Sequence, residues 1–335
     1  MEAKAALATV LALMAACPLC QSTETRIRWT RLPDRLFRTT EERFDVGSCD
    51  ACGTRFLSPM PPNERLAAYY PDGYWVGTEV GGEDAASKQR GLLEVYRRFV
   101  LRDHVRFVGR VVQGQRAGGK QVRVLDVGCG DGSFLQALGE SDCVGMDLSL
   151  PALRAAGARG IRGLQATLGD GALLPQSFSL VTAFHFLEHV YPPEPVLASM
   201  RNLLRPDGDL VLQVPNVRSW QAWLLGRYWG GLDVPRHLID YSDRSLIQLL
   251  ERCGFQVVAV AHHCLRDNPT TLANSLVPGL YPPARIVRGG ADHGLAAMLA
   301  NLGYLAVTLA CTPFALLESL FGRGASVMVH ARPRS

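Results

Sequence analysis

Residues 124–135, VLDVGCGDGSFL, place three glycines directly after a short apolar run and before a segment of helical character. The apolar run is typical of a buried strand. Glycines allow the backbone of the turn that follows to pass close to a ligand. Because many nucleotide-binding proteins share this order of elements, the stretch points to a nucleotide site and leaves open which nucleotide it takes.

Strand-like and helix-like segments alternate from residue 121 onward. The strand-like segments are QVRVLDVG, CVGMDLS, LVTAFHF, DLVLQVP and FQVVAVAHH. Ser149 and Ser242 are expected to cap the helices that follow them. This alternation predicts an α/β fold, in which helices cover both faces of a parallel sheet. Ligands bind beyond the carboxyl ends of such strands, where the glycine turn lies.

The glycine turn fits a dinucleotide poorly. Gly128 and Gly130 match the dinucleotide pattern, but the third glycine position is occupied by Ser133. Asp126 and Asp131 flank the turn, and two carboxylates would repel a pyrophosphate. They suit a ligand that carries cationic groups.

S-adenosylmethionine is such a ligand, because it has an ammonium and a sulfonium and no phosphate. Asp147 ends the second strand, and a carboxylate there can accept hydrogen bonds from both ribose hydroxyls. The turn, its acidic flanks and Asp147 together favour S-adenosylmethionine.

Five stretches in this order carry a family resemblance: LDVGCGDGSF, GMDLS, SFSLVTAFHFLEHV, LLRPDGDLVLQVPN and DVPRHLIDYS. They resemble class I S-adenosylmethionine-dependent methyltransferases. They are similar to the bacterial subgroup related to ubiquinone-biosynthesis O-methyltransferases, which often has N-terminal Cys-x-x-Cys knuckles. The resemblance covers residues 120–262 well. It implies a Rossmann-like seven-stranded sheet in the order 3-2-1-4-5-7-6, with strand 7 antiparallel.

The resemblance also implies a set of cofactor-binding residues. The turn would hold the aminocarboxypropyl part, Asp147 the ribose and Leu148 the adenine, while two residues after the fourth strand would line the boundary between cofactor and substrate. The full set is Asp126, Gly128, Cys129, Gly130, Asp147, Leu148, His185 and Phe186.

Two further segments offer residues for chemistry. Glu188 and His189 follow the fourth strand, and a Glu–His pair can act as an oriented base, since histidine titrates near neutral pH. Arg236 and His237 lie in the long connection after the fifth strand, where Arg236 could hold a carboxylate or phosphate of the substrate. Either histidine could be the base, and both could instead be satisfied structural groups.

Four cysteines form two Cys-x-x-Cys pairs, CPLC and CDACG: Cys17, Cys20, Cys49 and Cys52. Such pairs can converge on one tetrahedral zinc, and four sulfur ligands leave no open position, so its role would be structural. The alternative is two unrelated pairs. The other five of the nine cysteines are scattered, which favours a reducing compartment and a cytoplasmic location. An apolar run at residues 5–16 leaves a signal peptide as a competing interpretation.

We expect a zinc-ribbon-like unit over residues 1–60, a helical connector or lid over 61–118, and a methyltransferase domain over 119–335. An apolar helical insertion at 265–323 interrupts the domain, and residues 294–317 carry no charge. They are long enough to span a membrane. A single crossing, however, would place the final β-strand on the far side of the membrane, where it could not join the sheet. A lid for an apolar or lipid-linked acceptor, a peripheral membrane contact and a dimer interface remain open.

A formal net charge of +4 gives no reason to expect nucleic acid as a partner. The sequence thus predicts a methyltransferase for a small-molecule or lipid-linked acceptor, with O-transfer favoured over C- or N-transfer. Two rivals remain: a non-catalytic scaffold that binds a partner through its zinc knuckle, and a nicotinamide-dependent dehydrogenase.

Overall fold

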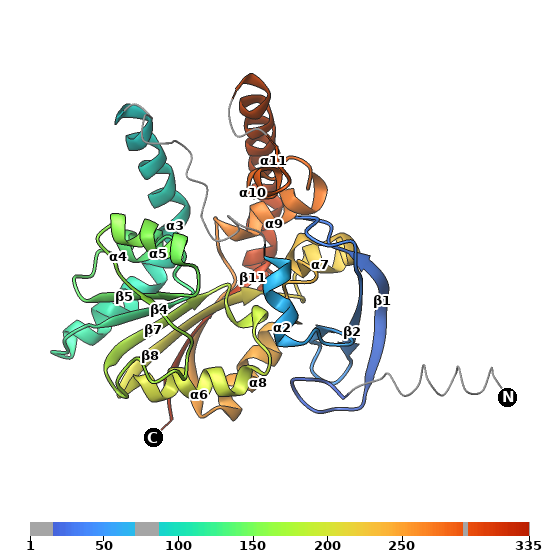
Figure 1. Cartoon of the computed structure of the whole chain (residues 1–335). Helices are drawn as coiled ribbons and strands as arrows, with labels where there is room; N and C mark the ends of the chain where they lie inside the picture. The colour runs from blue at the N-terminus through green and yellow to red at the C-terminus, as the bar shows by residue number, and fades with distance from the viewer. Residues whose placement is uncertain (1–15, 71–86, 291–293, 335) are drawn as a thin grey trace.

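The structure is a computed structural model that describes residues 16–70, 87–290 and 294–334. A twisted sheet carries helices on both faces, and a smaller N-terminal sheet stands beside it (Figure 1). The apolar run at residues 5–16, for which a signal peptide is one interpretation, lies outside the described residues apart from its last residue.

The main sheet has seven strands in the order β6-β5-β4-β7-β8-β11-β10. Their bounds are β4 (Val124–Val127), β5 (Cys143–Asp147), β6 (Arg162–Gln165), β7 (Phe178–Phe184), β8 (Leu204–Pro215), β10 (Phe255–Ala261) and β11 (Ser326–Pro333). Numbered along the chain, this is 3-2-1-4-5-7-6, and β11 runs antiparallel to both of its neighbours. The predicted strand order and the antiparallel seventh strand are confirmed.

Burial explains why residues 124–127 form the central strand. All four side chains of β4 are buried, and the strand pairs in parallel with β5 and β7. Val124 packs in a core cluster with Phe107 and Val108, which lie in the long helix before β4. Leu125 packs in a second core cluster on the other face of the sheet. The strand therefore needs apolar residues on both faces, which is typical of a parallel sheet covered by two helical layers.

The helices of the main domain are α3 (Ser87–Ala117), α4 (Ser133–Leu138), α5 (Leu150–Ala158), α6 (Pro193–Leu203), α7 (Trp220–Leu225) and α8 (Asp243–Arg252). In Figure 1, α6 and α8 lie below the sheet and α3 rises on the opposite side. The side chain of Ser149 caps α5, and Ser242 and Ser245 form a capping box at the start of α8. Both helix starts agree with the sequence.

The N-terminal sheet contains β1 (Thr25–Pro33), β2 (Arg43–Cys49) and β3 (Arg55–Leu57), all antiparallel. A fourth strand, β9 (Ile239–Asp240), comes from the long connection after β8 and pairs with β3. The sequence did not indicate this strand. Short helices α2 (Asn63–Leu66) and η1 (Ala67–Tyr69) follow β3.

Three helices occupy the segment between β10 and β11: α9 (Asp267–Leu276), α10 (Pro282–Val287) and α11 (Leu295–Leu320). α11 packs against α9 and projects from the body of the molecule (Figure 1). Single helical turns complete the connections: η2 (Leu187–His189) after β7, then η3 (Gly226–Tyr228) and η4 (Gly230–Leu232) after α7.

Candidate active site

The glycine turn leaves β4 at the carboxyl edge of the sheet and enters α4. Gly128 has a φ of 73°, and a Cβ there would lie 3.0 Å from the ring of Phe186. Gly130 has a φ of 53°, and a Cβ built on it would meet no atom within 4 Å. The turn therefore needs glycine for its backbone conformation, and it leaves open space above Gly130 where a ligand can approach the backbone.

Asp147 fixes this turn to the next strand. One carboxylate oxygen accepts a hydrogen bond from the amide of Gly130 at 2.9 Å, and the other accepts one from the amide of Ser149 at 2.8 Å. Leu148, the residue expected beside the adenine, is 65% exposed and offers an apolar surface next to the turn. The structure thus brings Gly130, Asp147 and Leu148 together at one edge, as a nucleoside site requires.

The two acidic flanks of the turn differ from the sequence expectation. Asp131 forms an ion pair with Arg159 at 3.0 Å, so its charge is offset. Asp126 is buried, and burial raises its pKa to about 7, although the hydroxyl of Thr182 donates a hydrogen bond to it. The expectation that Asp126 and Asp131 give the glycine turn a strong negative charge is therefore not supported. Asp147 is the carboxylate best placed for a cofactor hydroxyl. Cys129 is buried and packs against Gly145.

His185 and Phe186 follow β7 at the same edge. Nδ1 of His185 lies 3.2 Å from a carboxylate oxygen of Glu188, and Nε2 lies 3.3 Å from one of Asp267. Burial alone would lower the pKa of His185, but Asp267 and Glu188 raise it to about 10. Glu188 is fully buried, and burial alone would raise its pKa, but His185, His189 and His237 together lower it. Glu188 therefore stays ionised as the partner of His185 rather than acting as an accessible base.

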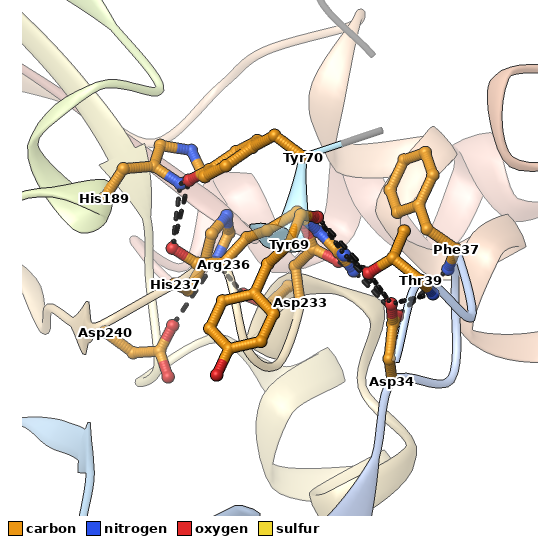
Figure 2. A network of polar contacts seen from close by, with 11 residues as sticks. Asp34, Phe37, Thr39, Tyr69, Tyr70, His189, Asp233, Arg236, His237 and Asp240 are labelled. Atoms are coloured by element: carbon orange, nitrogen blue, oxygen red, sulfur yellow. Dashed lines mark hydrogen bonds and ion pairs between the residues drawn. The ribbon is translucent and has the colours of Figure 1, made fainter. Parts of the chain in front are cut away.

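His189 and His237 meet edge to face, with ring centroids 4.7 Å apart (Figure 2). Nδ1 of His189 lies 2.9 Å from the hydroxyl of Tyr70 and 3.0 Å from the carbonyl oxygen of Arg236. Because a carbonyl only accepts hydrogen bonds, the contact favours the tautomer protonated at Nδ1, with the lone pair at Nε2. Burial and His237 lower the pKa of His189 to about 4, so the ring is neutral at pH 7.

His237 is more enclosed than His189. Its Nδ1 lies 2.9 Å from the carbonyl oxygen of Gly231 and 3.5 Å from a carboxylate oxygen of Asp240. Burial would lower its pKa, but Asp240 and nearby carboxylates raise it. These contacts hold the ring in place beside His189, which fits a positioning role.

Arg236 does not have the role expected from the sequence. Its side chain is 0% exposed, and it pairs with Asp34 at 2.8 Å and with Asp233 at 2.7 Å (Figure 2). It also lies 4.5 Å from the ring centroid of Phe37. A guanidinium enclosed by two carboxylates cannot reach a substrate anion, so Arg236 instead ties the loop after β1 to the connection after β8.

The four cysteines come together as predicted. All four sulfur atoms lie within 4.8 Å of one another, with 3.7 Å between Cys17 and Cys52 and 3.6 Å between Cys20 and Cys49. Four thiolates around a tetrahedral zinc with bonds of about 2.3 Å would lie about 3.8 Å apart. The spacing and the donor set fit such an ion.

Sequence reasoning missed several partners in this region: Asp34, Tyr70, Asp233 and Asp267. Asp34 and Arg236 are separated by 202 positions in the chain, and no local pattern reports a contact of that kind. The sequence around a carboxylate such as Asp34 therefore does not indicate which distant residue it pairs with.

A family model described as "Methyltransferase domain" matches residues 89–260, just over half of the chain. The ubiquinone biosynthesis O-methyltransferase of Histophilus somni (strain 2336) is 32% identical over 172 residues, covering 43% of this chain and 72% of that protein. The enzyme of the same name from Salmonella paratyphi A (strain ATCC 9150 / SARB42) is 30% identical over 190 residues, covering 50% and 74%.

Among solved structures, the chain is similar to the 1,6-didemethyltoxoflavin-N1-methyltransferase of Burkholderia thailandensis, with a TM-score of 0.44 and 16% identity over 87% of this chain and 96% of that one. A likeness this distant supports no statement about function. The matches in sequence do not favour a non-catalytic scaffold. They show that this chain belongs to the methyltransferase-domain family and is an S-adenosylmethionine-dependent methyltransferase.

Proposed function

We propose that this enzyme methylates an oxygen atom of an apolar or lipid-linked small molecule, and that it does so at a membrane surface. The names of the relatives, which are O-methyltransferases at about 30% identity, support the choice of oxygen. The exposed surface of α11 is the observation that carries the choice of acceptor and place.

α11 is apolar on the side that faces away from the protein. The helix has 26 residues and a mean hydropathy of 1.7 over its most apolar window, of which only 17% is buried. Its buried residues are Ala297, Tyr304, Cys311, Ala315 and Glu318. The outward side is lined by exposed Leu295, Met298, Leu299, Leu302, Leu305, Leu309, Leu316 and Leu317. An apolar surface of this extent marks an interaction site with a protein or a lipid.

The connection to the sheet argues for a surface contact rather than a crossing. The chain runs from the end of α11 directly into β11, which lies between β8 and β10. A single crossing would carry β11 to the far side of the membrane and remove it from the sheet. A helix that lies in the interface buries its apolar side in lipid and keeps the sheet whole.

Vesicle sedimentation tests the proposal. We expect the protein to sediment with vesicles of phosphatidylcholine and phosphatidylglycerol. A Leu302→Glu/Leu309→Glu variant should partition at least ~10-fold less, because each buried apolar side chain contributes about 1.5–3 kcal/mol. The control is Leu174→Glu, since Leu174 is 77% exposed but lies in the loop before β7.

A protein that stays in the supernatant would contradict the proposal. A second outcome would also contradict it: the unsubstituted protein is a dimer that does not bind vesicles, and the double variant is a monomer. α11 would then be a subunit interface.

The residues at the carboxyl edge of the main sheet can assist the transfer of a methyl group to the acceptor oxygen. S-adenosylmethionine supplies a methyl carbon that its sulfonium already activates, so the protein has to align the acceptor hydroxyl and take its proton. His189 is neutral and has its lone pair at Nε2, which makes it our proposed base. Glu188 would act indirectly, by holding His185.

Replacing His189 by alanine should lower kcat by about 100-fold or more, while the affinity for S-adenosylmethionine stays the same. His237→Asn should cause a smaller loss of kcat, because His237 would only position its neighbour. The reverse order of the two losses would identify His237 as the base. Full activity in His189→Ala would reject the assignment.

We also propose that Cys17, Cys20, Cys49 and Cys52 hold a structural zinc ion. The four cysteines are free of disulfides, and their spacing fits tetrahedral coordination. A closed set of four thiolates would supply folding energy to the N-terminal unit and no open position for catalysis.

A further inference from the structure

Four side chains from different elements converge on a single carboxylate oxygen, Oδ2 of Asp267. The distances to it are 2.7 Å from Gln213 Nε2, 2.9 Å from Cys264 Sγ, 3.3 Å from His185 Nε2 and 3.6 Å from His104 Nε2. One oxygen cannot accept four good hydrogen bonds, so the cluster is crowded around a point that a cation could share.

The cluster lies at the carboxyl edge of the main sheet, where ligands of this fold class bind. His104 comes from α3, Cys264 follows β10, and Asp267 begins α9. His185 follows β7, and Gln213 lies near the end of β8. Residues from separate parts of the chain thus meet beside the methyl-transfer region, and of these only His185 also belongs to the candidate cofactor set.

Two histidines of the cluster have ring nitrogens without a hydrogen-bond partner among the described residues: His185 at Nε2, and His104 at both nitrogens. His104 is 0% exposed, and neither of its ring nitrogens makes a hydrogen bond of normal geometry with any described residue. Its ring is held edge to face against Phe184, at 4.9 Å between centroids, with Nε2 toward Asp267. A buried polar group without a partner is costly, so its orientation toward a carboxylate and a thiol calls for a shared ligand.

The ligand atoms of His104, Cys264 and Asp267 all lie within 4.8 Å of one another. A tetrahedral ion with bonds of about 2.0–2.3 Å places its ligand atoms about 3.3–3.8 Å apart, so shifts of less than about 1 Å would close the site. An imidazole, a thiolate and a carboxylate are the donors that zinc accepts together. The thiolate and the carboxylate would also balance the two positive charges of the ion, and the thiol proton would be released on binding.

We propose that His104, Cys264 and Asp267 form a second metal site, selective for a zinc-like divalent cation. His185 borders this site, because its Nε2 lies 3.3 Å from the same carboxylate oxygen. A site with three protein ligands and a further position differs in kind from the closed cluster of four cysteines. The site is independent of the acceptor and the membrane contact proposed above.

Metal content of the purified full-length protein tests the proposal. We expect about two zinc ions per chain, and about one in His104→Ala and in Cys264→Ser, because each removes a ligand of one site only. Cys143→Ser is the matched control: Cys143 is also a buried thiol, but it lies in β5 and should leave the metal content unchanged. The loss of one equivalent is the decisive quantity and does not depend on how much metal the four cysteines hold.

A second measurement needs no variant. Titration of metal-free protein with Co²⁺ should give two spectral phases, one with the strong charge-transfer bands of four thiolates and one with the weaker bands of a single thiolate. Cys264→Ser, checked for folding by circular dichroism, should lose only the second phase. The absence of the weaker, single-thiolate phase in the unsubstituted protein, or unchanged metal content in both His104→Ala and Cys264→Ser, would overturn the second site.

Discussion

At the scale of single residues, Asp147 is central to the candidate cofactor site. It holds the amides of Gly130 and Ser149 and is the carboxylate best placed to reach a ribose. We expect Asp147→Asn to weaken S-adenosylmethionine binding by about 10-fold to 100-fold, since hydrogen bonds to a charged group contribute about 1.5–3 kcal/mol. Calorimetry measures this, with the exposed Asp207→Asn as the control. Undiminished affinity in Asp147→Asn would remove the residue from the cofactor site.

Asp126 predicts a pH dependence of stability. Its folded pKa of about 7 lies above the unfolded value of 3.8, so the folded state binds more protons between these values, and stability falls as the pH rises from about 4 to about 7. Asp126→Asn keeps a neutral acceptor for Thr182 and escapes this loss. Relative to the unsubstituted protein, the variant should gain about 2–3 kcal/mol between pH 5 and pH 8.

Urea unfolding at the two pH values checks this prediction, and Asp207→Asn should show no comparable gain. A gap between Asp126→Asn and the unsubstituted protein that stays constant with pH would mean that Asp126 is ionised throughout.

Some residues of the candidate site could be predicted from the sequence, and others could not. The glycines, Asp147 and the four cysteines could be named as candidates from the sequence because local geometry or spacing dictates their residue type. Whether the charges of Asp131 and Arg236 are available to a ligand could not be predicted from the sequence. Asp131 is paired with Arg159, and Arg236 is paired with Asp34. A charged residue near a ligand turn says little about the field there until its partners are known.

At the scale of elements, β4, β5 and β7 could be predicted because their apolar residues are buried almost throughout. β6 is mostly exposed, and its place in the sheet followed only from the family resemblance. Strand β9 could not be predicted. It has two residues and exists because Ile239 pairs with Phe56 of the N-terminal sheet. Its residues have no periodicity to detect, so the joining of the two sheets is visible only in the structure.

α11 presents the opposite case. Its length and apolar character could be predicted from the sequence, and the structure adds that a narrow buried side contacts α9 while the wide side faces outward. Composition alone does not distinguish a core helix from an exposed one. The low burial of α11 excludes a role as additional core and supports the lipid contact proposed above.

At the scale of the whole molecule, the N-terminal unit is joined to the methyltransferase sheet by polar contacts around Arg236. The guanidinium pairs with Asp34 of the first unit and Asp233 of the second, and it also donates to the carbonyl oxygen of Tyr69 (Figure 2). The next residues of this connection include His237 and strand β9. The same segment therefore supports the candidate base and the second sheet. Arg236 is thus a structural link between the N-terminal unit that holds the four cysteines and the candidate active site.

Arg236→Ala tests this link against a role in substrate binding. Removal of the cation would leave the carboxylates of Asp34 and Asp233 without their shared counter-charge, and we expect a loss of about 3–5 kcal/mol in the free energy of unfolding. Arg227→Ala, at an exposed arginine on the same connection, should change stability by less than about 0.5 kcal/mol. If Arg236 instead held a substrate anion, its removal would raise the KM for the acceptor and leave the free energy of unfolding close to that of Arg227→Ala. Denaturant unfolding and steady-state kinetics on the same two variants separate these outcomes.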